Sequence, residues 1–267
     1  MSNQKTINDV KTFWDSRPCN IRHSSEQVGT RKYFDEVEAR KYFVEPHIPK
    51  FADFSAWTGK RVLEIGCGIG TDAVNFVRNG AVYTGVELSR ESLEIAKKRF
   101  EVFNLEGSFL EGNAEIIDQL FVGKSFDLIY SFGVLHHTPN ISRALNAISR
   151  ISNEETILKM MLYAKHSWKN ALIMEGLDQP EAQYGCPIAN VYSREEVTEL
   201  LNNSGFAVQH IHQDHIFPYI VDKYKNYEYV EEDWFKVMTP QVRKALESQL
   251  GWHLLIQAKK VDQEKLN

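Results

Sequence analysis

The stretch RVLEIGCGIGTDAVNFVRNGAVYTGVEL, from Arg61 to Leu88, decides the fold of this chain. A short apolar run at residues 62–65 predicts a parallel strand that is buried on both faces. Glycines then stand at three alternate positions, so that backbone N–H groups and the positive end of the next helix can approach a ligand closely. A second apolar strand follows, and a carboxylate, Glu87, stands at its end. This is the layout of the first βαβ unit of a nucleoside-binding sheet.

The glycine spacing separates two kinds of nucleoside site. Dinucleotide sites favour G-x-G-x-x-G, which would suit an NAD(P)-dependent oxidoreductase, whereas the third glycine here arrives one residue early, at Gly70. The segment instead resembles the first motif, E/D-x-G-x-G-x-G, of the class I S-adenosylmethionine-dependent methyltransferases. The resemblance implies S-adenosylmethionine (SAM) as the cofactor, with Glu87 on its ribose hydroxyls. The SAM-binding residues that it implies here are Glu64, Gly66, Cys67, Gly68, Gly70, Glu87 and Leu88.

Two later segments match the pattern of the same family. SFLEGN at residues 108–113 is similar to the strand and turn that flank the adenine, where relatives often carry G-D-A. Asn113 departs from that pattern, although its amide oxygen can still accept a hydrogen bond. SFDLIYSFGVLHHTP at residues 125–139 resembles the fourth strand of small-molecule methyltransferases. The further SAM-binding candidates that the resemblance implies are Asn113, Ala114, Ser131 and His136.

The resemblance implies an α/β fold. We expect a Rossmann-like, doubly wound, seven-stranded sheet with an antiparallel last strand, a helical N-terminal lid and cap insertions. No linker is long enough to separate two domains, so residues 1–267 are expected to form a single methyltransferase domain. In it, residues 1–56 would be lid helices, 57–163 the SAM-binding half, and 164–192 and 214–250 insertions that cap the substrate.

Hydrophobic periodicity predicts the individual elements. The expected helices are Ile7–Trp14, Tyr33–Val44, Arg90–Phe100, Ile141–Ile151 and Ser193–Asn202, and the expected later strands are Thr156–Tyr163, Ala207–Gln213 and Gly251–Ala258.

Composition excludes several classes of partner. The net charge of −5 argues against a nucleic-acid surface, which needs clustered positive charge. The sequence has no run of about 18 apolar residues and no signal-peptide stretch, so we expect a cytoplasmic protein without a membrane partner. The three cysteines lie far apart and indicate neither a disulfide framework nor a zinc cluster. The expected partner is a small-molecule acceptor, and the oligomeric state stays open.

For methyl transfer, the protein must hold the acceptor in line with the methyl carbon and exclude water. It must also remove a proton where the acceptor carries one. Histidine titrates near neutrality and is the natural base. The candidates near the carboxyl edge of the sheet are His136, His137, His166 and His215. Each has a structural alternative, such as capping a turn, and an acceptor that is already deprotonated needs no base.

Aromatic residues crowd the second predicted cap. Residues 217–235 hold seven aromatic side chains interleaved with five acidic ones. This pattern predicts either a lid around a cationic or planar acceptor or a small core of the lid's own. Aromatic residues of the N-terminal helices face the same alternative. The substrate-binding candidates are Trp14, Tyr33, Tyr163, Tyr219 and Tyr224.

One motif favours a different kind of enzyme. The sequence H-x-H-x-D-H at residues 210–215 is the metal-binding signature of the metallo-β-lactamase fold, and neutral imidazole suits zinc. Taken alone it would suggest a binuclear zinc hydrolase. It comes late in the chain, after a complete SAM-binding half, and only His253 follows it, so we expect no metal.

The leading hypothesis is therefore SAM-dependent methyl transfer to a nitrogen or oxygen of a small-molecule acceptor. A carboxyl acceptor or a peptide or carrier-bound acceptor is the first alternative, and a metallohydrolase is a weaker one. A SAM-binding protein without catalytic activity would have the same sequence features.

Overall fold

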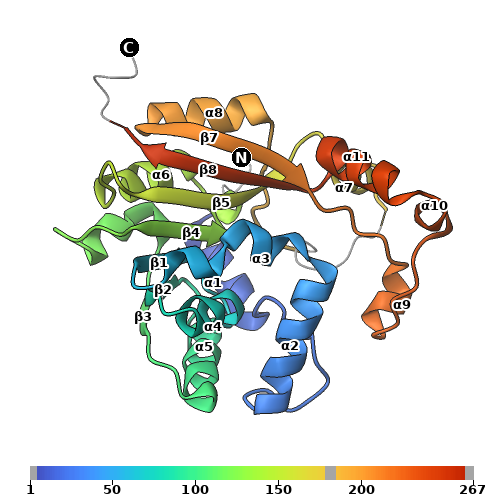
Figure 1. Ribbon diagram of the computed structural model, residues 1–267, viewed down its shortest axis with the longest axis horizontal. Coiled ribbons are helices and arrows are strands. Elements are labelled where there is room, and N and C mark those ends of the chain that lie inside the picture. The colour runs from blue at the N-terminus through green and yellow to red at the C-terminus, as the bar shows by residue number, and fades with distance from the viewer. Residues whose placement is uncertain (1–4, 178–184, 262–267) are drawn as a thin grey trace.

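The computed structural model describes residues 5–177 and 185–261. Its strands are β1 (Arg61–Ile65), β2 (Val82–Glu87), β3 (Ser108–Glu111), β4 (Leu128–Phe132), β5 (Ile157–Ala164), β6 (Val191–Tyr192), β7 (Phe206–Asp214) and β8 (His253–Lys260). Within these described residues they form one eight-stranded sheet in the order β3-β2-β1-β4-β5-β8-β7, with β6 beside β5 (Figure 1).

The pairing confirms the predicted Rossmann-like sheet. The strands from β3 to β5 run parallel, whereas β8 is antiparallel to both β5 and β7. The two-residue strand β6, which pairs with the end of β5, was not predicted. Because β8 runs the other way, its first residue, His253, lies at the same edge of the sheet as the carboxyl ends of the parallel strands. That edge is where ligands of open α/β sheets bind.

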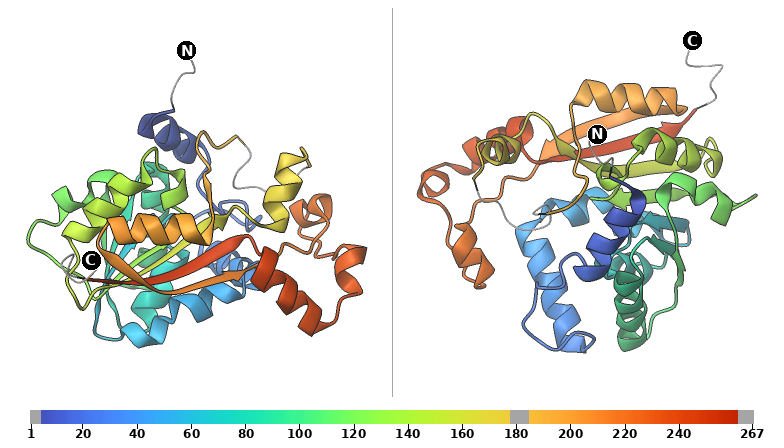
Figure 2. Two further views of the ribbon diagram at one scale, coloured as in Figure 1. Left: turned by 90° about the horizontal axis from the view of Figure 1, so that it is seen from above. Right: turned by 180° about the vertical axis from the view of Figure 1, so that it is seen from behind.

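Helices cover both faces of the sheet (Figure 2). The apolar sides of α6, α8 and η2 form one core with the strands, and those of α3, η1, α4 and α5 form the other. The helices are α1 (Ile7–Ser16), α2 (Arg31–Val44), α3 (His47–Ala52), α4 (Thr71–Arg78), α5 (Arg90–Phe103), α6 (Ile141–Arg150), α7 (Trp168–Met174), α8 (Arg194–Asn203), α9 (Val221–Lys225), α10 (Asp233–Lys236) and α11 (Pro240–Leu250), with 3-10 turns η1 (Phe54–Trp57), η2 (Ala114–Leu120) and η3 (Leu135–His137).

Every helix and strand that periodicity predicts is present, with ends that differ by at most three residues. The N-terminal segment forms α1, α2 and α3, as expected of lid helices. The insertion at 214–250 forms α9, α10 and α11, which extend beyond the ends of β7 and β8 (Figure 1). The insertion at 164–192 contributes α7 and β6, and its residues 178–184 lie outside the described part. Among the described helices, none is long and apolar enough to cross a membrane.

Six of the nine histidines are buried, an unusual number for a side chain that is half-charged near neutral pH. Burial lowers the pKa of His23 to about 3 and those of His47 and His137 to about 4, because the charged form loses its hydration. Burial also lowers the pKa values of His136, His215 and His253.

We expect these histidines to make the fold acid-labile. In the unfolded chain a histidine titrates near 6.5, so the unfolded state binds more protons than the native state between about pH 4 and 6.5. The stability is therefore complete above pH 6.5 and is lost as the pH falls toward 4. Each of His23, His47 and His137 costs roughly 2 kcal/mol at pH 5. Denaturant unfolding at pH 5, 6, 7 and 8 measures this, and a free energy of unfolding that is constant from pH 5 to 8 would contradict it.

Candidate functional site

A cavity of about 210 Å³ lies at the carboxyl ends of the parallel strands. Its wall includes the ends of β1 and β2, the glycine turn after β1, and side chains of α1 and β5. A single water needs only about 10–15 Å³ measured in this way, so the cavity has room for a much larger ligand. The segments in which the sequence pattern places the cofactor therefore meet around one space.

The glycine turn begins at a position that has no room for a side chain. Gly66 donates its N–H to the Val86 carbonyl at 2.7 Å, and it has a positive φ of 77°. A Cβ added at Gly66 would overlap the side chain of Val134. Gly68 also has a positive φ, but a Cβ there would meet no atom within 4 Å. Gly66 is thus needed for packing, whereas Gly68 leaves the cavity wall open.

Glu87 joins the glycine turn to the next helix. Its carboxylate accepts one hydrogen bond from the Gly68 N–H at 2.8 Å and another from the Ser89 N–H at 2.9 Å. The carboxyl is 9% exposed, and burial raises its pKa despite these hydrogen bonds. Each carboxylate oxygen can accept more than one hydrogen bond, so Glu87 can still receive the hydroxyl groups of a ribose. The neighbouring Leu88 also lines the cavity.

Two further carboxyl groups line the cavity beneath the turn. Glu64 accepts a hydrogen bond from the Tyr83 hydroxyl at 2.6 Å, and burial, helped by the charge of Asp72, raises its pKa to about 8. Asp72 accepts from the Lys41 ammonium at 2.7 Å. The described lining residues include four carboxyl groups, those of Glu45, Glu64, Asp72 and Glu87, and one lysine, Lys41, which binds Asp72. A ligand that carries positive charge, as SAM does on its sulfonium and ammonium groups, fits this wall.

At the adenine end of the cavity, the structure places the residues that the sequence pattern indicates. Asn113 and Ala114 line the cavity together with Gly112. The Asn113 amide oxygen, however, accepts from the Glu115 N–H at 2.9 Å and caps η2. Asn113 therefore fixes the start of η2 at the cavity wall.

The opposite end of the cavity is mostly apolar. Trp14 of α1 and Tyr163 of β5, two of the substrate-binding candidates from the sequence, line it. Phe132 and Met161 continue this wall, and Lys41, Glu45 and His253 add polar groups. These five residues are not among the candidates from the sequence, because they come from α2 and its cap, β4, β5 and β8, which no local motif links.

His137 is the one predicted base that lines this cavity among the described residues. Its Nδ1 lies 2.6 Å from the Ile188 carbonyl oxygen, and its ring meets the Trp14 ring edge-on at 5.4 Å. A carbonyl oxygen only accepts, so Nδ1 carries the hydrogen and Nε2 is left as the basic nitrogen. Because burial lowers its pKa to about 4, the ring is neutral at physiological pH.

The structure does not place three predicted cofactor residues at the cavity. Ser131 is fully buried and donates its hydroxyl to the Ile65 carbonyl at 3.1 Å, which ties β4 to β1. His136 is also fully buried and lies against Tyr163, with 3.6 Å between the ring centres. Gly70 lies against Ala96 of α5. These residues support the wall from behind, and we withdraw their predicted contacts with the cofactor.

Three predicted substrate residues also lie elsewhere. Tyr33 is fully buried in a core cluster with Phe34 and donates its hydroxyl to the Ile21 carbonyl at 2.9 Å. Tyr219 and Tyr224 belong to an aromatic cluster on α2, where the Arg40 guanidinium lies 4.2 Å from the centre of the Tyr224 ring. The cation in this cluster is therefore supplied by the chain itself, and the cluster is a small core of the cap.

The H-x-H-x-D-H motif does not converge on one point. His210 and His212 are exposed on β7, and Asp214 accepts from Lys244 at 2.8 Å. His215 instead turns inward, with a positive φ of 73°, and lies at a neighbouring cavity beside His47. His166 is exposed after β5. The binuclear zinc site of a metallohydrolase is therefore not formed, and His166 and His215 do not reach the cavity of the glycine turn.

Comparison with known proteins decides the family. A family model described as "Methyltransferase domain" matches residues 37–211, which is 175 of the 267 residues. The chain belongs to the methyltransferase domain family. This confirms the methyltransferase family inferred from the motifs.

Curated relatives of this methyltransferase match over about a third of the chain. It is 34% identical over 96 residues to phthiotriol/phenolphthiotriol dimycocerosates methyltransferase 1 of Mycobacterium ulcerans, which is 35% of this chain and 34% of the relative. It is 34% identical over 95 residues to the fatty-acid O-methyltransferase of Mycolicibacterium smegmatis, which is 35% of this chain and 33% of the relative. The chain thus spans about a third of the length of the curated relatives that it matches.

Solved structures with the same fold cover nearly the whole methyltransferase. The magnesium protoporphyrin IX methyltransferase of Synechocystis PCC 6803, solved with bound SAH, superposes with a TM-score of 0.63. The alignment covers 95% of this chain and 99% of that chain at 15% sequence identity. At this identity the likeness establishes the fold alone.

The two glycines of the turn give a matched pair of variants. We expect Gly66→Ala to cost about 2–5 kcal/mol of stability, because it adds overlap with Val134 to the strain of a left-handed backbone. Gly68→Ala adds only the strain, about 1–2 kcal/mol, because its Cβ would enter open space. Denaturant unfolding of both variants checks this order. Equal losses in the two variants would show that Val134 does not restrict the turn.

Proposed function

We propose that this methyltransferase transfers a methyl group from SAM to a nitrogen or oxygen of a small-molecule acceptor, with a hydroxyl oxygen best supported. The observation that carries this proposal is His137: a neutral imidazole in the cavity wall with Nδ1 bound to the Ile188 carbonyl. A hydroxyl must lose its proton during transfer, and a base with a free lone pair on Nε2 can take it.

The residues that would hold SAM follow from the cavity wall. Glu87 would accept hydrogen bonds from the ribose hydroxyls, and the Gly66–Gly68 turn would lie against the methionine part. Gly112 and Ala114 would lie beside the adenine. SAM supplies an electrophilic methyl group on a sulfonium that is an excellent leaving group. The protein therefore has to position the acceptor, exclude water and remove one proton.

The acceptor would lie among Trp14, Phe132, Met161 and Tyr163. This largely apolar wall suits an acceptor with a planar or apolar body and a single polar group at the reacting end. The names of the curated relatives support an oxygen acceptor, since they include a fatty-acid O-methyltransferase and a ubiquinone biosynthesis O-methyltransferase. A fatty acid presents a carboxyl oxygen, so these names do not favour a hydroxyl over a carboxyl. A carboxyl acceptor would need no base, which makes the His137 variants decisive between the two acceptor classes.

Replacing His137 tests the proposed base. We expect His137→Gln to lower kcat by about 10²–10⁴-fold, the usual worth of a general base, while SAM affinity stays within a few-fold. The matched control is His166→Gln, an exposed histidine away from the cavity, which should leave kcat unchanged. The wild-type profile of kcat/KM should also show no histidine inflection near pH 6.5, because the pKa of His137 is about 4. Full activity in the folded His137→Gln enzyme would favour a carboxyl or another acceptor that needs no base.

Replacing Glu87 tests the cofactor site. We expect Glu87→Gln to weaken binding of S-adenosylhomocysteine by about 10- to 100-fold, because it removes the charge that receives the ribose hydroxyls and the Gly68 N–H. Glu111→Gln is the control, since Glu111 pairs in register with Glu87 on the adjacent strand and is bound to Lys11. Isothermal titration calorimetry measures both affinities. Equal affinities in the two folded variants would refute the assigned ribose contact.

A further inference from the structure

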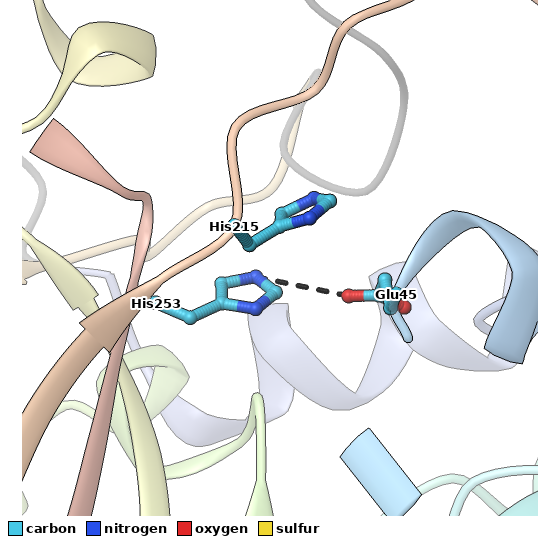
Figure 3. Close-up of side chains that lie close together, drawn as sticks. All are labelled: Glu45, His215 and His253. Atoms are coloured by element: carbon cyan, nitrogen blue, oxygen red, sulfur yellow. Dashed lines mark ion pairs between the residues drawn. The ribbon is translucent and has the colours of Figure 1, made fainter. Parts of the chain in front are cut away.

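Three side chains that no sequence motif connects meet where the acceptor side of the cavity adjoins the neighbouring cavity. Glu45, His215 and His253 each offer one ligand atom, and these atoms all lie within 4.8 Å of one another (Figure 3). We propose that Glu45, His215 and His253 bind a divalent transition-metal ion such as Zn²⁺. Two histidines and one carboxylate are a ligand set that proteins use for catalytic zinc and for other first-row metals.

The antiparallel last strand brings the two histidines together. Asp214 at the end of β7 pairs in register with His253 at the start of β8, so His215 follows directly beside it. The His215 carbonyl accepts from the Trp252 N–H at 2.7 Å, and the positive φ of His215 turns its side chain inward. The two imidazole rings then stack with 4.7 Å between their centres. A left-handed backbone is uncommon for any residue but glycine, and here it places a ligand.

Glu45 completes the set from the other side of the cavity. It is the C-terminal cap of α2, and its carboxylate oxygen lies 3.7 Å from Nε2 of His253 (Figure 3). Bonds of about 2.1 Å in a tetrahedron place ligand atoms about 3.4 Å apart. The Glu45–His253 pair is thus within a few tenths of an ångström of that spacing. The ligand atom of His215 lies within 4.8 Å of those of Glu45 and His253, so binding one ion would draw it closer to them.

The nitrogen of His253 that faces away from Glu45 already has a partner. Its Nδ1 lies 2.9 Å from Nε2 of His47, and His47 is itself buried at the start of α3. A hydrogen bond of this kind fixes the ring of a metal-bound histidine and leaves its other nitrogen for the ion. His253 is therefore oriented with Nε2 toward Glu45.

The charges around the cluster are compatible with a cation. Both His215 and His253 are buried, and the neutral imidazole is the form of histidine that binds metals. The nearby ammonium groups have other partners: Lys41 binds Asp72, Lys244 binds Asp214, and Lys169 lies over the Trp252 ring. Glu45 supplies the negative charge of the cluster, and a bound cation would neutralise this charge.

The position of the cluster suggests its use, and this step rests on the proposed function. Glu45 and His253 line the cavity of the glycine turn, whereas His215 and His47 line the neighbouring cavity. An ion held between them would have an open coordination position toward the acceptor. It would bind an oxygen of the acceptor and lower that oxygen's affinity for its proton, which Nε2 of His137 would then take.

Metal titration of the full chain tests the site. Protein stripped with a chelator is titrated with Zn²⁺, and with Co²⁺, whose visible absorption reports its ligands. We expect one ion per chain. Glu45→Gln and His253→Gln should each weaken Zn²⁺ binding by more than the roughly 10- to 100-fold expected of His47→Ala, which removes only a partner of a ligand. The controls are His210→Ala and His212→Ala, exposed histidines of the same motif.

The outcomes separate the two proposals. Wild-type protein that binds no Zn²⁺, or binds it equally well after Glu45→Gln, overturns the metal site. Circular dichroism and binding of S-adenosylhomocysteine are measured on the same samples. The near-isosteric Glu45→Gln variant should keep its fold and its S-adenosylhomocysteine affinity while losing the ion. A wild-type protein that binds Zn²⁺ but not S-adenosylhomocysteine would refute the proposed function and leave the metal site standing.

Discussion

The structure depends on one buried carboxylate. Glu87 accepts the N–H of Gly68 from the turn after β1 and the N–H of Ser89 from the start of α5. These two bonds fix the glycine turn against the end of β2. Burial alone would push Glu87 toward its neutral form, and backbone donors oppose that shift. The cavity wall is therefore rigid where a ribose would bind, before any ligand arrives.

The parts of the fold that sequence reasoning predicts are those encoded locally. The strands of the parallel half are recognised in the sequence as apolar runs of a few residues. The glycine turn after β1 is recognised by its fixed spacing. The cap is different. Seven aromatic residues in nineteen positions are consistent with a substrate lid or with a small core, and only the long-range contact of Tyr224 with Arg40 on α2 distinguishes the two. Local periodicity contains no information about a partner 184 residues away.

The candidate site also has one half that is encoded locally and one half that depends on long-range contacts. Its proposed cofactor half comes from one contiguous stretch, so the sequence alone predicts Gly66, Gly68 and Glu87 as neighbours. Its acceptor half is assembled from α1, α2, β5 and β8, and there the sequence identifies Trp14 and Tyr163 but misses Glu45. His136 and His137 show the limit most clearly, because adjacent histidines on a turn must point in different directions. Only the contact with Ile188 selects His137 as the one whose free nitrogen is basic.

The electrostatics of the cavity explain why both halves suit a positive charge. Glu64, Asp72 and Glu87 lie buried in one wall, and the ammonium group of Lys41 is bound to Asp72. With burial as the main cause, the pKa of Glu64 is raised to about 8, so without a ligand this carboxyl is largely protonated near pH 7. A cation that enters the cavity favours the ionised form, and its binding is accompanied by release of that proton. Because Glu45 and His253 lie at the acceptor end of the same cavity, a metal ion there and a sulfonium at the glycine turn would be separate positive charges. The buried carboxylates of the wall compensate both.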